Sequence, residues 1–437
     1  MPSSKKKRKR KVRHGRLAIV FVGLALVIAA IGGGIYGLSH IFLGSREKEI
    51  VREVDVNGAQ IPITKEPTQD DSFTFVGVGD NLLHDRLFRT FMDKYGNRNF
   101  LKQYENLVPY TEKSDLNYIN LETLIAGDAY GFSGYPSFNG PSEYFDSLEQ
   151  AGFNWISAAS NHTLDYGDQA VIDEKNYANE HVPNVSVTGI HTSQEDADTP
   201  VVRDVNGLKV GLATFTFGEN MNVFPDNSWL IDIYRNPDYS INYDLLDQRL
   251  DALNAISDVQ IISVHWGNEY ETVPNEEERE LAEYFNSKGV EAVIGTHPHV
   301  IQPVEMIHGD NQDTLVYYSL GNALSGQDTN DRMIGGMASF KLDYDRETGT
   351  STFSDIAFIP TISLINSAKD EFSVVTIDQY TDEMAQDNYI TDLGYDMSKQ
   401  WIIDYVKSVM GESTEEITID TGEPAADQQN QSDKKSA

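Results

Sequence analysis

The chain alternates short apolar runs with polar and amphipathic segments from residue 73 onward. Six of these runs are rich in β-branched and aromatic residues, a pattern that indicates buried strands. The predicted strands are 73–78, 116–120, 155–159, 261–264, 292–294 and 315–318. We find no internal repeat among them, which favours a folded domain over a repeat array.

Two helices between these strands can be placed from the residues at their ends. One opens at Pro141-Ser142-Glu143 and ends at Gly152, and the other opens at Asn275 and ends at Gly289. Both have acids in the first turn and glycine after the last, as helix ends favour. Each helix leads into a predicted strand, and this strand–helix–strand order predicts a layered α/β fold.

Two tight connections predict additional antiparallel strands. Asn206-Gly207 lies between two apolar runs, and residues 346–350 join two alternating ones. An Asn-Gly pair favours the two-residue turn of a hairpin. We therefore expect a mixed sheet, or mixed sheets.

The amino-terminal 16 residues contain nine Lys or Arg and no acid, and an apolar stretch over residues 17–44 follows at once. About twenty apolar residues span a bilayer, and the positive-inside rule keeps the basic end in the cytoplasm. The sequence therefore predicts a basic cytoplasmic tail (1–16), a transmembrane signal-anchor (17–44) and a carboxyl-terminal domain outside the cell. A cleaved signal peptide is the nearer alternative, and a nuclear-localisation or nucleic-acid segment is the more distant one.

The part beyond the anchor divides by composition. Residues 45–72 are polar and contain Pro62 and Pro67, which is typical of a stalk. Residues 73–410 contain the predicted strands and helices. Residues 411–437 are polar and acidic with few apolar side chains, which predicts a disordered tail.

From residue 17 onward the chain has 25 Lys and Arg against 68 Asp and Glu. This charge excludes a general nucleic-acid-binding function, because phosphates would be repelled. The absence of cysteine excludes disulfides, thiolate metal sites and thiol nucleophiles. Any metal must therefore bind His, Asn and carboxylate side chains.

Unusual polar residues follow the predicted strands directly. In open α/β sheets, ligands bind in the crevice outside the carboxyl ends of the strands. The residues at these ends are Asp80, Asn81, Asn120, Glu122, Asn161, His162, Asp165, His265, His297, His299 and Asn322. We expect them to converge on one crevice.

Taken singly, these residues have ordinary explanations. An Asp or Asn after a strand is usually a turn or a helix cap, and a lone histidine such as His265 is more often packed than liganded. His297 and His299, separated by a proline, are a stronger candidate. Together, carboxylates, an Asn and three His at successive strand ends predict a site for one or two divalent ions such as Mn, Fe or Zn.

Six motifs in this order resemble the CapA family of capsule-synthesis proteins. That family is associated with bacterial poly-γ-glutamate capsules and is related to the calcineurin-like metallophosphoesterases. The motifs are Gly-Asp-Asn-Leu-Leu (79–83), Asn-Leu-Glu (120–122), Asn-His-Thr-Leu-Asp-Tyr-Gly (161–167), His-Trp-Gly-Asn-Glu-Tyr (265–270), Gly-Thr-His-Pro-His-Val (295–300) and Tyr-Ser-Leu-Gly-Asn (318–322). The resemblance covers residues 73 to 365 and implies a metallophosphoesterase-like fold, and the predicted anchor also fits the family.

The resemblance also implies a role for each motif. The implied metal ligands are Asp80 and His299 for a first ion, Glu122 in the bridging position, and Asn161, His265 and His297 for a second ion. His162 matches the histidine that faces the developing charge on a phosphoryl group, where it would stabilise that charge or protonate the leaving oxygen. Asp165 would orient His162.

Two positions depart from the metallophosphoesterase pattern. Leu82 replaces the histidine that usually follows the first aspartate by two residues, and His84 would substitute for it only if the loop bends. Glu122 replaces the usual bridging aspartate and lengthens that arm by one methylene. We therefore expect one firmly held ion and a second that is weak or absent.

Three functions remain open from the sequence. The first is a metal-dependent hydrolase that cleaves a phosphate ester or an amide of a capsule polymer. The second is a non-catalytic capsule-assembly component that holds polymer or partner proteins at the membrane. The third is an anchored receptor for a ligand in the same crevice, which would not need three converging histidines. The process that the resemblance implies is capsule synthesis or export.

The expected partners are the membrane, capsule-synthesis membrane proteins and an anionic polymer. The acidic surface would repel poly-γ-glutamate beyond contact range, so we expect local contacts, with Arg86 and Asn322 as candidate substrate-binding residues. Arg86 and Arg89 would form a basic patch, although both also fit solvent-facing helix positions. Four loop aromatics either overhang the crevice or pack the loop: Tyr130, Phe132, Tyr135 and Phe138.

Overall fold

The computed structural model describes residues 51–54, 60–63, 71–310 and 312–422, which fall in two compact units divided after Thr68. In the first unit, β1 (Val51–Val54) pairs antiparallel with β2 (Gln60–Ile63), inside the segment predicted to be a stalk. The predicted basic tail and transmembrane anchor lie outside the described residues. None of the helices within the described ranges has the length and apolar character needed to cross a bilayer.

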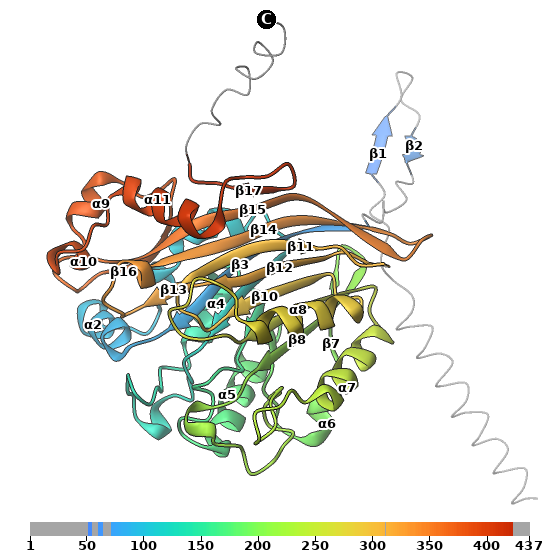
Figure 1. Ribbon diagram of the computed structural model, residues 1–437, viewed down its shortest axis with the longest axis horizontal. Coiled ribbons are helices and arrows are strands. Elements are labelled where there is room, and N and C mark those ends of the chain that lie inside the picture. The colour runs from blue at the N-terminus through green and yellow to red at the C-terminus, as the bar shows by residue number, and fades with distance from the viewer. Residues whose placement is uncertain (1–50, 55–59, 64–70, 311, 423–437) are drawn as a thin grey trace, which may run out of the picture. The chain divides into compact units, whose positions relative to one another are not determined.

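The second unit is built on two sheets (Figure 1). One has the order β16 (Phe372–Thr376), β15 (Thr350–Ile365), β14 (Ile334–Asp345), β3 (Ser72–Leu82), β4 (Leu116–Leu121), β5 (Trp155–Ser157), β6 (Ser186–Thr188), with β13 (Asn322–Ser325) beside β3 and β17 (Ile417–Ile419) beside β15. The other has the order β11 (Ile301–Ile307), β12 (Thr314–Leu320), β10 (Ala292–Thr296), β9 (Val259–His265), β8 (Leu208–Thr216), β7 (Val201–Val205). All six predicted strands are present.

Both sheets are mixed, as predicted. In the larger sheet β3, β4, β5 and β6 run parallel, and β14 pairs antiparallel with β3. In the smaller sheet β8, β9, β10 and β12 run parallel, and β7 and β11 are antiparallel edges. Parallel neighbours end at the same edge of a sheet, so each sheet collects the carboxyl ends of its central strands at one edge.

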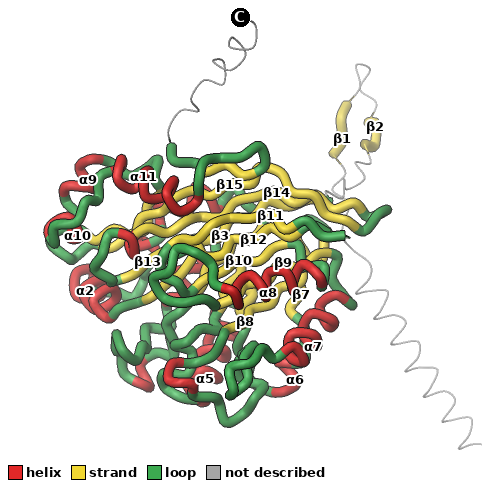
Figure 2. The backbone as a smooth tube through the Cα atoms, in the orientation of Figure 1, coloured by secondary structure: helices red, strands yellow, loops and turns green. Residues whose placement is uncertain are grey.

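Helices cover the outside of the sheets, as Figure 2 shows in red around the yellow strands. They are α2 (Asp85–Tyr95), α3 (Val108–Thr111), α4 (Tyr144–Gln150), α5 (Asp168–His181), α6 (Gln194–Ala197), α7 (Tyr243–Asn254), α8 (Glu276–Ser287), α9 (Asp382–Gln386), α10 (Tyr389–Asp392) and α11 (Lys399–Met410). Both ends predicted for α8 are confirmed, because Asn275 and Glu278 form a capping box and Gly289 has a positive φ of 80°.

The core follows from the two-residue period of the strands. On β9, Ile261 faces the main apolar cluster while Ile262 faces a second cluster. The second cluster includes Leu246 of α7 and Phe285 of α8, so these helices cover the outer face of the smaller sheet. Strands buried on both faces explain why the predicted runs are continuous and apolar.

Both predicted hairpins are confirmed. Asn206 and Gly207 turn between β7 and β8 with φ of 54° and 87°, as a type I′ turn requires. Residues 346–349 connect β14 to β15. The prediction of a disordered tail is wrong for its first part, because Ile417–Ile419 form β17 and pair in parallel with β15. Residues 423–437 of that predicted tail lie outside the described residues.

A crossing between the two sheets positions the functional residues. After β12 the chain passes through Gly321 into β13, where Asn322 pairs with Asp80 of β3. The backbone nitrogen of Asp80 donates to the carbonyl oxygen of Gly321 at 2.8 Å. A Cβ on Gly79 would lie 1.9 Å from that oxygen, so only glycine permits this approach.

Candidate metal centre

The residues predicted at the strand ends meet at one edge of the two sheets. Asp80 lies on β3, Glu122 follows β4, and Asn161 and His162 follow β5 in the larger sheet. His265 ends β9 in the smaller sheet, and the loop after β10 carries His297 and His299. The eight residues predicted for metal binding and catalysis are Asp80, Glu122, Asn161, His162, Asp165, His265, His297 and His299, and the structure brings them together through the contacts described below.

One group of ligand atoms consists of Asp80, Glu122 and His299, which are all buried and offer atoms within 4.8 Å of one another. Nδ1 of His299 lies 3.3 Å from Oδ2 of Asp80, and its Nε2 lies 3.5 Å from Oε1 of Glu122. These three residues are those implied for the first ion and the bridging position. Two carboxylates and an imidazole at this separation are close enough to share one cation.

The second group consists of Glu122, His265 and His297, again within 4.8 Å of one another. Nε2 of His265 lies 3.9 Å from Oε1 of Glu122 and 3.0 Å from Oδ1 of Asn161. Glu122 is therefore shared by the two groups. His297 has a φ of 98°, a costly conformation for a residue other than glycine, of the kind that concentrates at functional sites.

The hydrogen-bonding inventory of these residues fits a divalent ion. Both carboxylate oxygens of Glu122 and Nδ1 of His297 are buried without a hydrogen-bond partner among the described residues. Buried polar groups are nearly always satisfied, and an exception calls for an explanation such as an ion. Carboxylate oxygen and imidazole nitrogen are ligands for Mn, Fe or Zn, so the donor set fits the group that the resemblance implies.

The burial and the close spacing of these side chains also shift their pKa values. Burial raises the pKa of Glu122 well above its usual value, and burial lowers the pKa of His265 and His297, with further lowering by neighbouring histidines. For His299 burial also lowers the pKa, but Glu122 and Asp80 outweigh it and raise the pKa to about 9. A cation among these side chains would replace the proton on His299 and offset the cost of burying the carboxylates.

His162 and Asp165 form a pair beside the ligand groups. Nδ1 of His162 lies 2.8 Å from Oδ2 of Asp165, and that oxygen also accepts from the backbone nitrogen of Phe138 at 2.6 Å. The Phe138 ring packs edge-on against the imidazole, with centroids 4.7 Å apart. These contacts hold the ring in one orientation, in which Nε2 lies 3.4 Å from Nδ2 of Asn220.

A cavity of about 490 Å³ opens beside this pair. It is lined by His162 and Asp165, by Asn161 from the second group, and by Tyr135 of the aromatic loop. A molecule in this cavity would contact His162 and Asn161. The aromatic loop was expected either to overhang the crevice or to pack against itself, and its residues divide between the two. Tyr135 lines the cavity, whereas Phe138 is buried.

Asn322, a candidate substrate-binding residue, lies beside His299. Its side chain is fully buried, Oδ1 lies 3.1 Å from Nδ1 of His299, and Nδ2 donates to the carbonyl oxygen of Arg332 at 2.8 Å. Asn322 therefore positions His299. Arg86 donates to the carbonyl oxygen of Gly326. Its role in substrate binding stays a prediction.

His84 does not reach either ligand group. Its Nδ1 accepts from the backbone nitrogen of Gly326 at 3.1 Å, and burial lowers its pKa to about 4. It does not occupy the position left open by Leu82, whose backbone oxygen lies 3.2 Å from Nδ1 of His84. His84 therefore does not supply the ligand that the resemblance to metallophosphoesterases implies for the first group.

The structure gives a place in the site to three residues that the sequence left without a role. Asn120 donates to Oδ1 of Asp80 at 2.8 Å, and Nδ2 of Asn161 donates to Oδ1 of Asn220 at 3.3 Å. Glu219 lines the cavity and accepts from the backbone nitrogen of Leu164 at 2.9 Å. Glu219 and Asn220 follow β8, the second strand of the predicted hairpin, whose carboxyl end the sequence did not locate.

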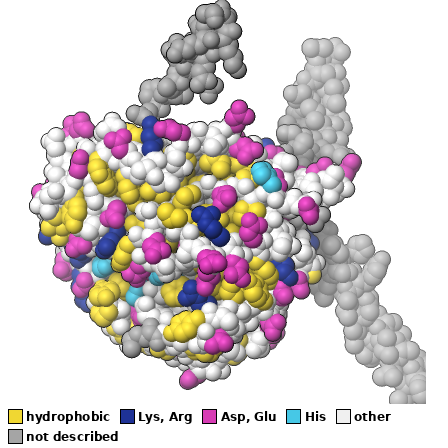
Figure 3. Space-filling view, viewed as in Figure 1, with side chains coloured by type: hydrophobic (Ala, Val, Ile, Leu, Met, Phe, Trp, Pro, Cys, Tyr) yellow, Lys and Arg dark blue, Asp and Glu magenta, His cyan; other side chains and the backbone are white. Residues whose placement is uncertain are grey.

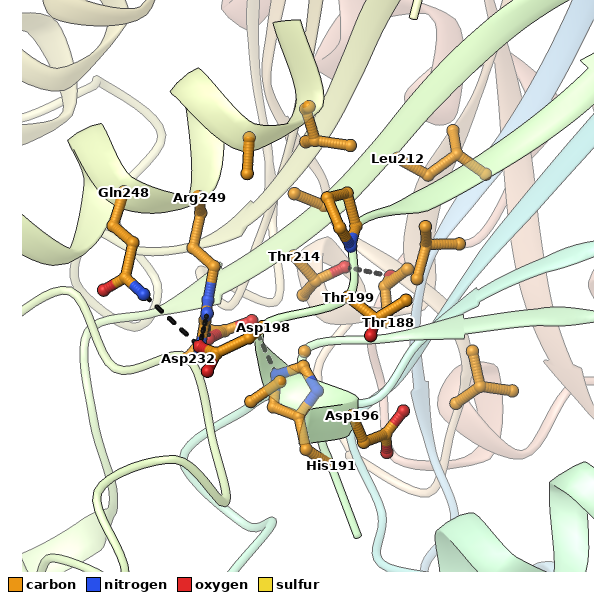
Figure 4. Close-up of a pocket in the computed structure, with 18 of the residues that line it drawn as sticks. Thr188, His191, Asp196, Asp198, Thr199, Leu212, Thr214, Asp232, Gln248 and Arg249 are labelled. Atoms are coloured by element: carbon orange, nitrogen blue, oxygen red, sulfur yellow. Dashed lines mark hydrogen bonds and ion pairs between the residues drawn. The ribbon is translucent and has the colours of Figure 1, made fainter. Parts of the chain in front are cut away.

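A second, smaller cavity of about 60 Å³ contains none of the predicted site residues. Figure 4 shows its polar side chains paired with one another: Asp232 contacts Nε2 of His191 at 2.9 Å and Nε of Arg249 at 2.8 Å. These contacts lower the pKa of Asp232, although burial alone would raise it. The Asp232 carboxylate in this cavity is therefore paired with two basic side chains.

Comparison with known proteins agrees with the motifs. The chain is 28% identical to the PGA biosynthesis protein CapA of Bacillus subtilis (strain 168) over 182 residues, which is 41% of this chain and 44% of that protein. It is 23% identical to the capsule biosynthesis protein CapA of Bacillus anthracis over 263 residues, 59% of this chain and 61% of that protein. The chain thus spans less than two thirds of either relative.

Among solved structures, a hypothetical protein from Thermus thermophilus matches over 66% of this chain and 97% of its own, at 17% identity and a TM-score of 0.38. A likeness at that score establishes nothing about function. The model of the family described as bacterial capsule synthesis protein PGA_cap matches residues 74–327, more than half of the chain. These residues include the strand ends that form both ligand groups, and the chain belongs to the PGA_cap family of bacterial capsule synthesis proteins.

Proposed function

We propose that this protein is a metal-dependent hydrolase that acts in the synthesis or export of a poly-γ-glutamate capsule. In this proposal residues 17–44 anchor it in the cell membrane, and the domain that carries the metal centre lies outside the cell. The names of the two relatives, one in PGA biosynthesis and one in capsule biosynthesis, support the process. Capsule-synthesis membrane proteins are the expected partners.

One observation carries the hydrolase proposal. Glu122 is fully buried between two groups of ligand atoms, and neither of its carboxylate oxygens has a hydrogen-bond partner within the described part of the chain. A buried carboxylate whose oxygens accept no hydrogen bond costs several kcal/mol. A divalent ion in either group would remove that cost, since Glu122 belongs to both.

The residues would divide the chemistry between them. Asp80, Glu122 and His299 would hold one ion, and Glu122 with Asn161, His265 and His297 would hold another. A bound divalent ion supplies Lewis acidity and a water of lowered pKa. His162 would hold or deliver a proton at Nε2, because Asp165 occupies its Nδ1.

The charge of the surface limits how polymer binds. On the face shown in Figure 3, acidic side chains are spread widely and basic ones stand apart from one another. Such a surface would repel a polyanion beyond contact range. The polymer would therefore bind locally at the site rather than along the surface.

The metal content of the purified full-length chain tests the proposal. We expect about one or two transition ions per chain after loading, and loss of at least one in His297→Ala. His308→Ala is the matched control, because His308 is an exposed histidine paired only with Asp313. A native chain that binds no metal under conditions that load known metalloenzymes would refute the proposal.

A non-catalytic assembly role is the second candidate. The observation in its favour is the incomplete first group, in which Leu82 stands where the related enzymes have a ligand and His84 turns to Gly326. A scaffold predicts that His162→Ala leaves capsule formation unchanged. A hydrolase predicts that this variant loses turnover while keeping its metal.

A further inference from the structure

The cavity beside His162 has an acidic lining. Asp165 and Glu219 lie in its wall and Glu269 at an exposed position, while no Lys or Arg is among the described residues that line it. An acidic cluster alone does not identify a ligand. Glu219 in the wall of the cavity adds a buried carboxylate oxygen that has no partner among the described residues.

Glu219 is a buried acid with one oxygen left unpaired. The residue is 6% exposed, its Oε2 accepts from the backbone nitrogen of Leu164 at 2.9 Å, and its Oε1 has no partner among the described residues. Burial, with a contribution from Asp165, raises the pKa of this carboxyl. A positive group in the cavity would offset that cost and satisfy Oε1.

The surroundings of Glu219 favour a cation over an anion. The exposed ring of Tyr135 lines the same cavity, and aromatic faces together with carboxylates are a common environment for ammonium groups. Arg235 lines a neighbouring hollow, but its Nη2 is paired with Oε1 of Glu277 at 2.6 Å. No other described cation lines either space, so an anionic group would meet carboxylates there.

We propose that this cavity binds a positively charged amino group of the substrate, with Oε1 of Glu219 accepting its hydrogen bond. The proposal rests on the proposed function, because the amino group belongs to the molecule whose other end reaches the metal centre. The free amino end of a γ-glutamyl chain has this chemistry. Glu219 is then a specificity-determining residue.

The test compares two probes that differ only in the amino group. They are the dipeptide γ-glutamylglutamate and its N-acetyl form, each titrated by calorimetry into the full-length, Mn²⁺-loaded chain. We expect the free amine to bind about tenfold more tightly or better, because a hydrogen bond to a charged group contributes that much. Equal affinities for the two probes, or no binding of either, would overturn the proposal.

Glu219→Gln is the decisive variant. The hydrogen bond from Leu164 would hold the new carbonyl oxygen in the place of Oε2, so the amide NH₂ would take the place of Oε1 and offer a donor where the carboxylate offered an acceptor. We therefore expect the variant to lose the preference for the free amine as fully as Glu219→Ala does. If the glutamine variant keeps that preference, Oε1 is not the acceptor and the proposal fails.

Glu174→Gln is the matched control. Glu174 is also a buried acid that accepts one backbone N–H, from Ile125 at 3.0 Å, but it does not line this cavity. The Glu174→Gln variant should retain the preference for the free amine. Metal content is measured in every variant: native chain without metal would refute the hydrolase proposal, whereas metal-loaded chain without amine preference would refute only the subsite.

Discussion

Glu174 on α5 is an acid whose ionisation the fold opposes. Its side chain is 1% exposed, and Oε1 accepts from the backbone nitrogen of Ile125 at 3.0 Å. Burial raises its pKa from 4.5 to about 8, against the lowering effects of that hydrogen bond and of Lys175. At neutral pH the folded protein therefore keeps a proton that the unfolded chain releases.

This difference makes stability depend on pH with a defined sign. The folded state binds more protons than the unfolded chain between pH 4.5 and about 8, so stability falls as the pH rises through this window. Each pH unit corresponds to about 1.4 kcal/mol. Between about pH 5 and pH 7.5, ionisation of this one acid in the unfolded chain should lower the free energy of unfolding by about 3 kcal/mol.

Glu174→Gln removes this contribution because an amide does not titrate. Burying the amide changes the free energy of unfolding by the same amount at every pH. This constant change does not affect how the difference in free energy of unfolding between native and variant varies with pH. Urea denaturation of both full-length proteins, monitored by tryptophan fluorescence from about pH 5 to pH 7.5, measures that difference. We expect the variant to gain about 3 kcal/mol relative to the native protein over this range. Parallel stability curves would show that Glu174 ionises normally and would refute the reasoning.

Three further predictions concern the candidate metal centre and the close contact between Gly79 and Gly321 beside it. Asp165→Asn removes the carboxylate at Nδ1 of His162, and since a hydrogen bond to a charged group contributes about 1.5–3 kcal/mol, hydrolase activity should fall about 10- to 100-fold with metal content unchanged by elemental analysis. Loss of metal together with activity would assign Asp165 a different role. Glu122→Gln removes the carboxylate shared by both ligand groups, so bound metal should fall below one ion per chain, and a fully loaded variant would contradict the shared position. Gly79→Ala places a methyl carbon 1.9 Å from the Gly321 oxygen, and chemical denaturation should show a loss of about 3 kcal/mol or more; unchanged stability would mean that the two sheets separate there at little cost.

The strands and helix ends could be predicted because their causes are local. The run at 261–264 is apolar on both faces whatever its neighbours are, and the structure extends it only to Val259–His265. The capping box at Asn275 and Glu278 involves residues three apart in one helix. The strand at Ile417–Ile419 could not be predicted because its cause is not local. It forms by pairing with a strand more than fifty residues away in the chain.

The candidate site could be predicted in part. Ligand types and their places after strands are visible in the sequence, and the resemblance assigned each one a role. The contact between Asn322 and His299 could not be predicted from the sequence. It forms because the chain crosses from the smaller sheet to β13, beside β3. Glu219 and Asn220 were also missed, because the sequence predicted the hairpin that contains β8 but did not locate the carboxyl end of that strand.

By itself the sequence determined the layered α/β class, the mixed strand directions and the residues that are candidates for metal binding. Only the tertiary structure decided that the strands form two sheets, that Glu122 belongs to two ligand groups, and that Glu219 lines a cavity and has one buried oxygen without a partner among the described residues. The physical reason is the range of the interactions. Periodicity and capping act over a few residues, whereas the burial and pairing of a polar atom depend on segments that meet only when the sheets pack.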